Sequence, residues 1–98
     1  MKICFLDNTN IPYTSADIDS NKLRGAENVI INLTRELNTL GHEITVYNNC
    51  DKEVKIENIE WKNIYNIQKD KNIYDIVVTN NDMQLFESIN ANKYVAFS

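Results

Sequence analysis

Residues 24–46, RGAENVIINLTRELNTLGHEITV, decide the fold. Apolar residues recur in this stretch at spacings of three and four, which is the period of an amphipathic helix; they are Ala26, Val29, Ile30, Leu33, Leu37 and Leu40. Gly41 follows the last of them, at the position where helices commonly end on a glycine. The stretch therefore predicts a helix over about 26–40, followed at once by a strand over about 44–47.

Apolar runs on both sides of this unit predict further strands. Ile3–Leu6 is short, apolar and without alternation, and Ile76–Val78 forms a β-branched run within Tyr74–Thr79. Such runs are typical of strands buried on both faces of a parallel sheet. Tyr94–Phe97 is expected to be the last strand. A helix capped by Asn81 is expected before it, and its apolar residues are Met83, Leu85, Phe86 and Ile89.

The middle of the chain leaves two arrangements open. Val54–Ile56 alternates like a strand, and Ile59–Trp61 is a second short candidate. The link 48–53 is too short for a helical crossover between parallel strands. Either Val54–Ile56 pairs antiparallel with the preceding strand, or it forms a surface arm and the third strand comes later. Ile64–Lys69 is expected to be a short helix.

This alternation of strands and helices predicts an α/β fold with a mostly parallel sheet. We expect residues 1–98 to form a single Rossmann-like domain with three layers, α/β/α. Its sheet should have about five strands in the order 3-2-1-4-5. No helix follows the last strand to cover it, so we expect the chain to be part of a larger domain. An uncovered strand edge of this kind can support self-association.

Composition and charge exclude several classes of protein. Hydrophobic residues make up 43% of the chain and charged residues 24%, a balance typical of a globular domain. The net charge of −4 argues against nucleic acid as a partner. Cys4 and Cys50 are not spaced as metal ligands and are expected to be reduced thiols. No signal peptide is recognisable and no run approaches the roughly 20 apolar residues of a transmembrane segment, so a cytoplasmic location is expected.

The strongest candidate for a binding site is the start of the main helix, Arg24, Gly25, Ala26 and Glu27. Unpaired backbone N–H groups and the helix dipole attract anions such as a diphosphate to this end of a helix. Gly25 lets a ligand approach the backbone closely. The alternative is that Gly25 only ends a loop. No GxGxxG fingerprint is present, so a dinucleotide site is not indicated.

Asp7 and Asn8 follow the first strand and should face the same crevice, because ligands of open α/β sheets bind outside the carboxyl ends of the strands. Asp7, Asp17 and Asp19 could bind a cation or a sugar, and the alternative is that they are solvated loop acids. His42 lies at the opposite end of the helix and is expected to be structural. No catalytic residue and no metal site can be assembled from the sequence.

Two stretches give the chain a family resemblance. Residues 24–33 and 36–37, followed by Leu-Gly-His-Glu-Ile-Thr-Val at 40–46, resemble the N-terminal signature of family 4 glycosyltransferases. These are retaining enzymes of the GT-B fold, in which two Rossmann-like domains face each other across a cleft. The opening Met-Lys-Ile and the strand at 74–78 are similar too. The resemblance is specific over 24–46.

This resemblance implies that the chain is the acceptor-side part of a GT-B N-terminal domain and is inactive alone. Gly25 and Ala26 would approach the donor phosphates, with Arg24 and Glu27 beside them. The chain departs from the family at Arg24, where many members have a second glycine. The family's N-domain histidine lies beyond this chain, and the Glu-x7-Glu motif of the donor domain is absent from it.

The expected partners of the whole protein are therefore a nucleotide-sugar donor and a glycan or lipid-linked acceptor, with no obligatory metal. The acceptor would belong to cell-surface polysaccharide or glycolipid synthesis. The alternative is a non-enzymatic Rossmann-like module that binds a ligand or self-assembles.

Overall fold

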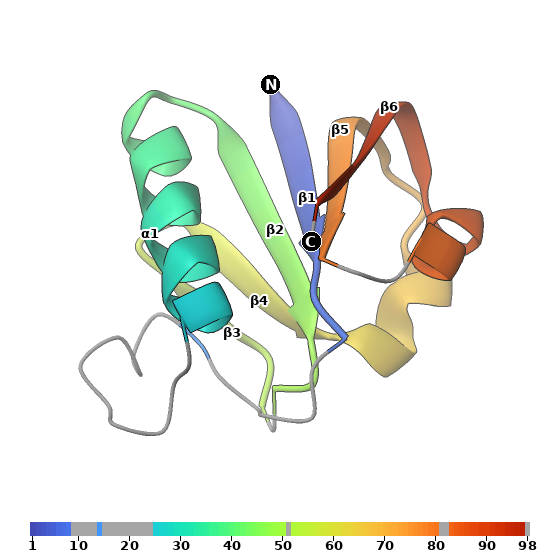
Figure 1. The fold of residues 1–98 in the computed structure, drawn as a ribbon, viewed down its shortest axis with the longest axis horizontal. Coiled ribbons are helices and arrows are strands. Elements are labelled where there is room, and N and C mark those ends of the chain that lie inside the picture. The colour runs from blue at the N-terminus through green and yellow to red at the C-terminus, as the bar shows by residue number, and fades with distance from the viewer. Residues whose placement is uncertain (9–13, 15–24, 51, 81–82, 98) are drawn as a thin grey trace.

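The computed structural model describes residues 1–8, 14, 25–50, 52–80 and 83–97, with the backbone alone at 25–27 and 97. Within these residues there are six strands, one α-helix and two 3₁₀ helices (Figure 1). The strands are β1 (Lys2–Leu6), β2 (Glu43–Asn48), β3 (Val54–Ile56), β4 (Ile59–Asn63), β5 (Ile73–Asn80) and β6 (Asn90–Phe97). The helices are α1 (Gly25–Thr39), η2 (Ile64–Lys69) and η3 (Met83–Ser88).

All six strands belong to one sheet with the order β3-β4-β2-β1-β5-β6. Every pair of neighbours is parallel except β3 and β4, which are antiparallel. The α/β class and the mostly parallel sheet are thus confirmed. The prediction of about five strands in the order 3-2-1-4-5 is wrong in count and order, because the antiparallel β3 is added at one edge.

The two faces of the sheet carry separate buried clusters. On the face toward α1 the cluster comprises Ile3, Phe5, Ile31, Ile44, Val46, Ile59 and Trp61. On the opposite face it comprises Cys4, Leu6, Tyr47, Ile64, Ile67, Tyr74, Val77 and Ile89. Successive side chains of β1 alternate between the two clusters, as the pleat of a strand requires. The apolar run of the first strand is thus explained by burial on both faces.

The helix α1 ends in a Schellman motif. The N–H of His42 donates to the Leu37 carbonyl at 3.2 Å, and the N–H of Gly41 donates to the Asn38 carbonyl at 3.0 Å. Gly41 has φ of +95°, a conformation that glycine adopts without steric cost. The predicted end of the helix is confirmed, and the turn leads directly into β2.

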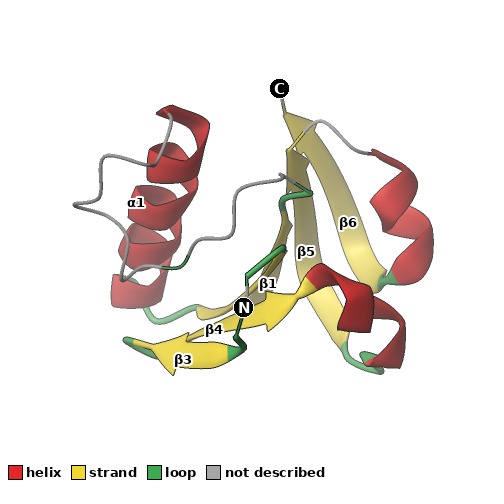
Figure 2. Cartoon of the chain, turned by 90° about the horizontal axis from the view of Figure 1, so that it is seen from below, coloured by secondary structure: helices red, strands yellow, loops and turns green. Residues whose placement is uncertain are grey.

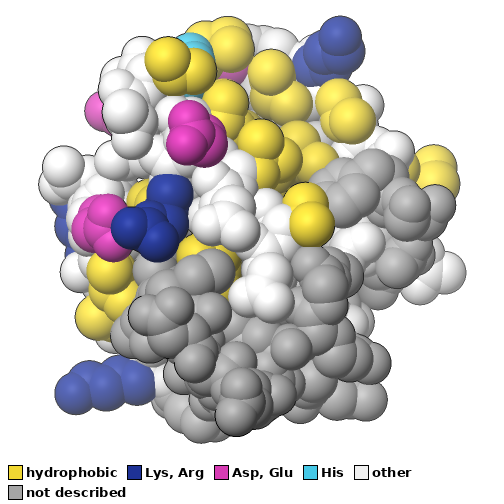
Figure 3. Space-filling view, turned by 60° about the vertical axis from the view of Figure 1, so that its left-hand side comes forward, with side chains coloured by type: hydrophobic (Ala, Val, Ile, Leu, Met, Phe, Trp, Pro, Cys, Tyr) yellow, Lys and Arg dark blue, Asp and Glu magenta, His cyan; other side chains and the backbone are white. Residues whose placement is uncertain are grey.

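The predicted apolar stripe of α1 is only partly the buried face. Of the stripe, Ile30 is buried and Leu37 is half-buried, whereas Val29, Leu33 and Leu40 are exposed; Ile31, which was not assigned to the stripe, is fully buried. Hydrophobic side chains are accordingly visible on the surface on this side of the molecule (Figure 3). The strongest contacts of α1 are with β2 and β4, and a helix that packs on a sheet buries only the side that faces it.

The β3–β4 pair is a tight hairpin. Ile56 and Ile59 are paired across a two-residue loop, and the loop residues Glu57 and Asn58 have φ of +53° and +66°. Positive φ at both central positions defines a type I′ turn, whose twist suits a hairpin. Val54–Ile56 does not pair with the strand before it. The strand that joins β2 comes later, as the second arrangement expected, and it is β4; Val54–Ile56 pairs antiparallel with β4 at the edge of the sheet.

This turn gives a first prediction. Asn-Gly is the preferred type I′ dipeptide, so the double variant Glu57→Asn/Asn58→Gly should raise the free energy of unfolding by about 1 kcal/mol. The ion pair between Glu57 and Arg35, at 3.6 Å, is exposed on both sides and its loss should cost less than about 0.5 kcal/mol. Urea denaturation measures the difference, with Glu57→Gln as the control for the ion pair. A double variant less stable than the wild type would contradict the turn assignment.

The two helices that follow β4 are short 3₁₀ helices, unlike the α-helix α1. η2 matches the short helix predicted at 64–69. η3 is a single short 3₁₀ segment with no buried residue, where a capped helix was expected, and Asn81 lies outside the described residues. β6 begins at Asn90, four residues before the predicted start, because it pairs with β5 along its whole length. Both 3₁₀ helices lie on the face of the sheet opposite α1 (Figure 2).

Candidate functional site

The carboxyl ends of the parallel strands carry a row of short polar residues. They are Asp7 and Asn8 after β1, Asn48 and Asn49 at β2, and Thr79 and Asn80 at β5. The chain leaves β1 for β2 on one side, and β5 lies on the other side. The strand order therefore reverses at β1, and such a switch point is where open α/β sheets bind ligands.

Asp7 lies at the centre of this row. Only 3% of its surface is exposed. Its N–H donates to the Tyr47 carbonyl at 2.9 Å, and its Oδ1 accepts from Asn80 Nδ2 at 3.4 Å. The residue thus connects β1 with both neighbouring strands. Burying a carboxyl group is costly unless polar partners compensate it, and these hydrogen bonds do so.

Asparagines of the neighbouring strands make further hydrogen bonds at this end of the sheet. Asn49 Nδ2 donates to Asn8 Oδ1 at 3.2 Å, and Asn48 Oδ1 accepts from the Cys50 N–H at 2.9 Å. The sequence predicted Asp7 and Asn8 as site residues but not Asn48, Asn49 and Asn80. Their positions could have indicated them, because each of these asparagines ends or directly follows an apolar strand.

The start of α1 lies at this same end of the sheet (Figure 1). The helix begins at Gly25, so the predicted anion-binding positions Gly25, Ala26 and Glu27 form its first turn. Arg24 lies outside the described residues. Asn28 directly follows this first turn, and its Oδ1 is buried without a hydrogen-bond partner within the described part of the chain. The structure therefore places the backbone of 25–27 near the carboxyl edge that Asp7 occupies.

His42 lies at the other end of α1, as predicted. Its Nδ1 is 3.2 Å from the amino group of Met1, at the edge of the sheet where the parallel strands begin. It is separated from Asp7 by the length of β1, and it has no part in the candidate site.

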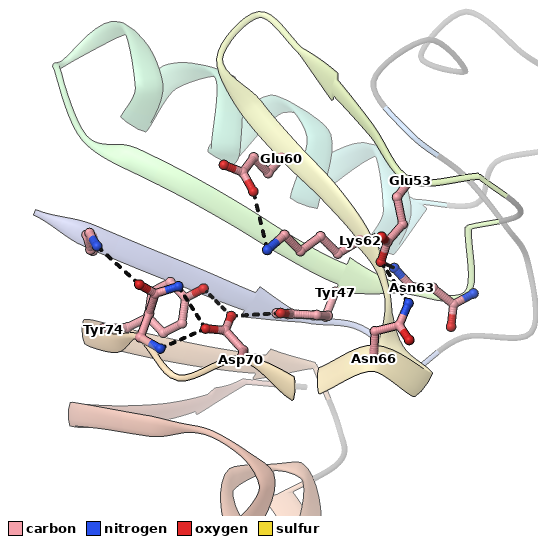
Figure 4. A network of polar contacts seen from close by, with 10 residues as sticks. Tyr47, Glu53, Glu60, Lys62, Asn63, Asn66, Asp70 and Tyr74 are labelled. Carbon is pink, nitrogen blue, oxygen red and sulfur yellow. Dashed lines mark hydrogen bonds and ion pairs between the residues drawn. The ribbon is translucent and has the colours of Figure 1, made fainter. Parts of the chain in front are cut away.

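A second polar cluster on the face opposite α1 was not foreseen. Asp70 Oδ2 accepts from the hydroxyl of Tyr47 at 2.7 Å and from the hydroxyl of Tyr74 at 2.5 Å (Figure 4). Asp70 Oδ1 accepts from the N–H of Asn72 at 2.9 Å and from its Nδ2 at 2.8 Å. Asp70 directly follows η2, so this cluster fastens the end of η2 to β2 and β5.

The cluster shifts the pKa of each of its members. Burial alone would raise the pKa of Asp70, but hydrogen bonds from Tyr74, Tyr47 and Asn72 outweigh burial and lower it. Burial and the nearby Asp70 carboxylate raise the pKa of both tyrosine hydroxyls. The folded protein therefore keeps Asp70 ionised and the two tyrosines neutral.

A hollow of about 500 Å³ is lined by Glu53 and Lys62 together with residues of this cluster. Glu53 Oε2 accepts from the N–H of Asn63 at 2.9 Å and from Asn66 Nδ2 at 3.0 Å, and these bonds lower the pKa of Glu53. Lys62 Nζ is 3.4 Å from Glu60 and 5.9 Å from the centre of the Tyr47 ring. These charges already have partners within the chain, so we assign this cluster to folding and keep the carboxyl edge as the candidate site.

Other classes of site find little support in the described residues. They contain no group of three or more His, Cys, Asp or Glu side chains placed to hold a metal ion. Cys4 and Cys50 are free and buried. Among the described residues, no helix is both long enough and apolar enough to cross a bilayer. No protein-family model, curated protein or solved structure matches the chain.

Proposed function

We propose that the chain forms the acceptor side of a sugar-nucleotide-dependent glycosyltransferase, within a Rossmann-like N-terminal domain of the GT-B kind. The observation that carries this proposal is the buried carboxylate of Asp7 at the switch point of the sheet. Carboxylate and amide groups are the usual partners of sugar hydroxyls, because together they accept and donate several hydrogen bonds. Asp7, Asn8, Asn49 and Asn80 offer such a set at one edge.

The first turn of α1 supplies the second part of the proposed site. Backbone N–H groups at Gly25 and Ala26 have no carbonyl partners inside the helix and favour an anion. In the proposed enzyme they approach the donor diphosphate, with Arg24 and Glu27 beside them. The nucleotide and the reacting sugar are held mainly by the second domain, so this chain alone is expected to bind a nucleotide sugar weakly and to transfer nothing.

Asp7→Asn tests the acceptor part of this proposal. The variant keeps the size of the side chain and an acceptor for Asn80 but removes the charge that strengthens hydrogen bonds to sugar hydroxyls. We expect short glycans to bind the wild-type chain with a dissociation constant on the order of 1 mM, and Asp7→Asn to weaken this about tenfold. Ligand-detected NMR with a panel of neutral and acidic oligosaccharides measures both values.

Asp75→Asn is the matched control. Asp75 Oδ2 accepts from the N–H of Lys2 at 2.7 Å, at the end of the sheet where the parallel strands begin. This change is far from Asp7 and should leave glycan affinity unchanged. Equal weakening by both variants would contradict a site at Asp7. Tight binding of UDP- or GDP-sugars to this chain would contradict the assignment of the donor site to a second domain.

A non-enzymatic, self-assembling module is the second candidate, and one observation favours it. The edge strand β6 is eight residues long and has no neighbour on its outer side among the described residues. Long open edges of this kind pair readily with another strand.

A further inference from the structure

The face of the sheet opposite α1 is apolar where η2 and η3 lie (Figure 2) and polar over β3 and β4. Lys55, Glu60 and Lys62 are on the polar part, because their neighbours in both strands pack in the cluster under α1. All three side chains are exposed or half-buried. One part of this face therefore belongs to the core, and the other part is a polar surface.

A polar surface is unusual on parallel strands, which are normally covered by apolar packing on both faces. The strands β2 and β4 are parallel, yet Thr45, Glu60 and Lys62 lie on this face of them. An element packed here would bury the charges of Glu60 and Lys62, which is costly without further partners. The surface therefore suits a polar ligand, and not a further layer of the core.

Two hollows of about 540 and 500 Å³ lie on this surface and share Lys62 and Asn72. Hollows of this size suit a small-molecule ligand. Five of the eight lysines of the chain line them, namely Lys2, Lys55, Lys62, Lys69 and Lys71. Four acids line them as well, namely Glu43, Glu53, Glu60 and Asp70. The hollows thus have an excess of lysine, although the chain as a whole has a net charge of −4.

The acids of the smaller hollow are already engaged, whereas two of its lysines are not. Asp70 accepts four hydrogen bonds and Glu53 accepts two, all from groups of this chain (Figure 4). Lys62 has an ion pair with Glu60. In the described part of the chain, no ion pair or hydrogen bond holds the ammonium group of Lys69 or Lys71. The unused hydrogen-bonding capacity of this hollow is therefore that of ammonium groups, which only donate.

We propose that the smaller hollow binds a small molecule that carries phosphate groups, with Lys69 and Lys71 as its main contacts and Lys62 beside them. A lysine ammonium is a compact point charge and a common partner of phosphate. The Asp70 cluster keeps its role in folding and forms a wall of the hollow. This inference is independent of the proposed function, because it uses neither Asp7 nor the start of α1.

An NMR titration with sodium pyrophosphate at constant ionic strength tests the proposal, since salt screens exposed charges. We expect a dissociation constant on the order of 1 mM, with the largest shift changes at Lys62, Lys69 and Lys71. The double variant Lys69→Gln/Lys71→Gln should bind about tenfold more weakly. Lys52→Gln/Lys93→Gln is the matched control, because it removes the same charge from lysines outside both hollows and should bind like the wild type.

Glu60→Gln gives a change in the opposite direction. It removes a carboxylate from the adjoining hollow and releases Lys62 from its ion pair, so pyrophosphate should bind about threefold more tightly. Glycerol phosphate, titrated in parallel, distinguishes a phosphate monoester from a diphosphate as the preferred ligand. Binding of either probe at these lysines supports the proposal.

Three results would overturn the proposal. The first is no shift change with either probe at about 10 mM, a concentration well above the expected dissociation constant. The second is equal weakening by both double variants, since binding would then follow the net charge alone. The third is that the largest changes occur at Gly25 and Ala26, which would place the anion at the start of α1.

Discussion

Ile31→Ala should lower the free energy of unfolding by about 3 kcal/mol, within the range typical of large-to-small changes in a packed core. Ile31 is fully buried in the cluster beneath the helix, and among the described α1 side chains Leu37 packs against the same cluster while only half-buried. Its truncation removes packing within this cluster, whose other members lie on β1, β2 and β4, and leaves a cavity between helix and sheet. A chain of this length has a total stability of about 5–15 kcal/mol, so the loss is a large fraction of it.

Leu33→Ala and Leu40→Ala are the matched controls for Ile31→Ala. They belong to the stripe that periodicity alone selects, but Leu33 is 39% exposed and Leu40 is 72% exposed. Each should cost less than about 1 kcal/mol, since little apolar area returns to water. Urea denaturation with fluorescence of Trp61 measures all three variants. If Leu33→Ala and Leu40→Ala proved as costly as Ile31→Ala, the helix would pack on a different face from the one described.

Asp70→Asn should cost about 2–3 kcal/mol, because hydrogen bonds to a charged group are strong and an amide nitrogen cannot accept one. Asp70 accepts four hydrogen bonds, two at each oxygen. In the variant either the two tyrosine hydroxyls or the two Asn72 donors lose their acceptor. Tyr47→Phe removes one bond only and should cost less. Thermal denaturation near neutral pH compares them, and an unchanged melting temperature for Asp70→Asn would contradict the role of this cluster.

The pH dependence of stability follows from the same cluster. The pKa of Asp70 is lowered on folding, so its contribution is present above the unfolded-state pKa of about 4 and is lost as the pH falls from there through the folded-state pKa. The pKa values of Tyr47 and Tyr74 are raised, so their contribution is present below about 10 and is lost as the pH rises above it. The stability difference between wild type and Asp70→Asn should therefore narrow below about pH 4.

The sequence predicted the elements whose own residues carry a clear pattern. The strands at β1, β2 and β5 and both ends of α1 follow from apolar runs, a helical period and a glycine at the C-terminus. The buried face of α1 did not follow, because periodicity shows which helix residues are apolar but not which strands lie beneath them. The pairing of β3 also escaped, since two adjacent positive-φ residues without glycine give a weak hairpin signal.

The candidate site was likewise predicted only in part. Asp7 was recognisable because it directly follows a buried strand. The partners Asn49 and Asn80 come from other strands and reach Asp7 and Asn8 only through the strand order. The contact of Tyr47 with Asp70 spans 23 residues and depends on the path of η2 across the sheet, which no local pattern specifies.

A residue-by-residue NMR titration of the wild-type chain with short glycans at millimolar concentration tests the proposed site most directly. We expect the largest amide shift changes at the carboxyl ends of the strands, at Asp7, Asn8, Asn49 and Asn80. Largest changes at the opposite edge, around Lys2 and Glu43, or no change with any glycan of the panel, would contradict it.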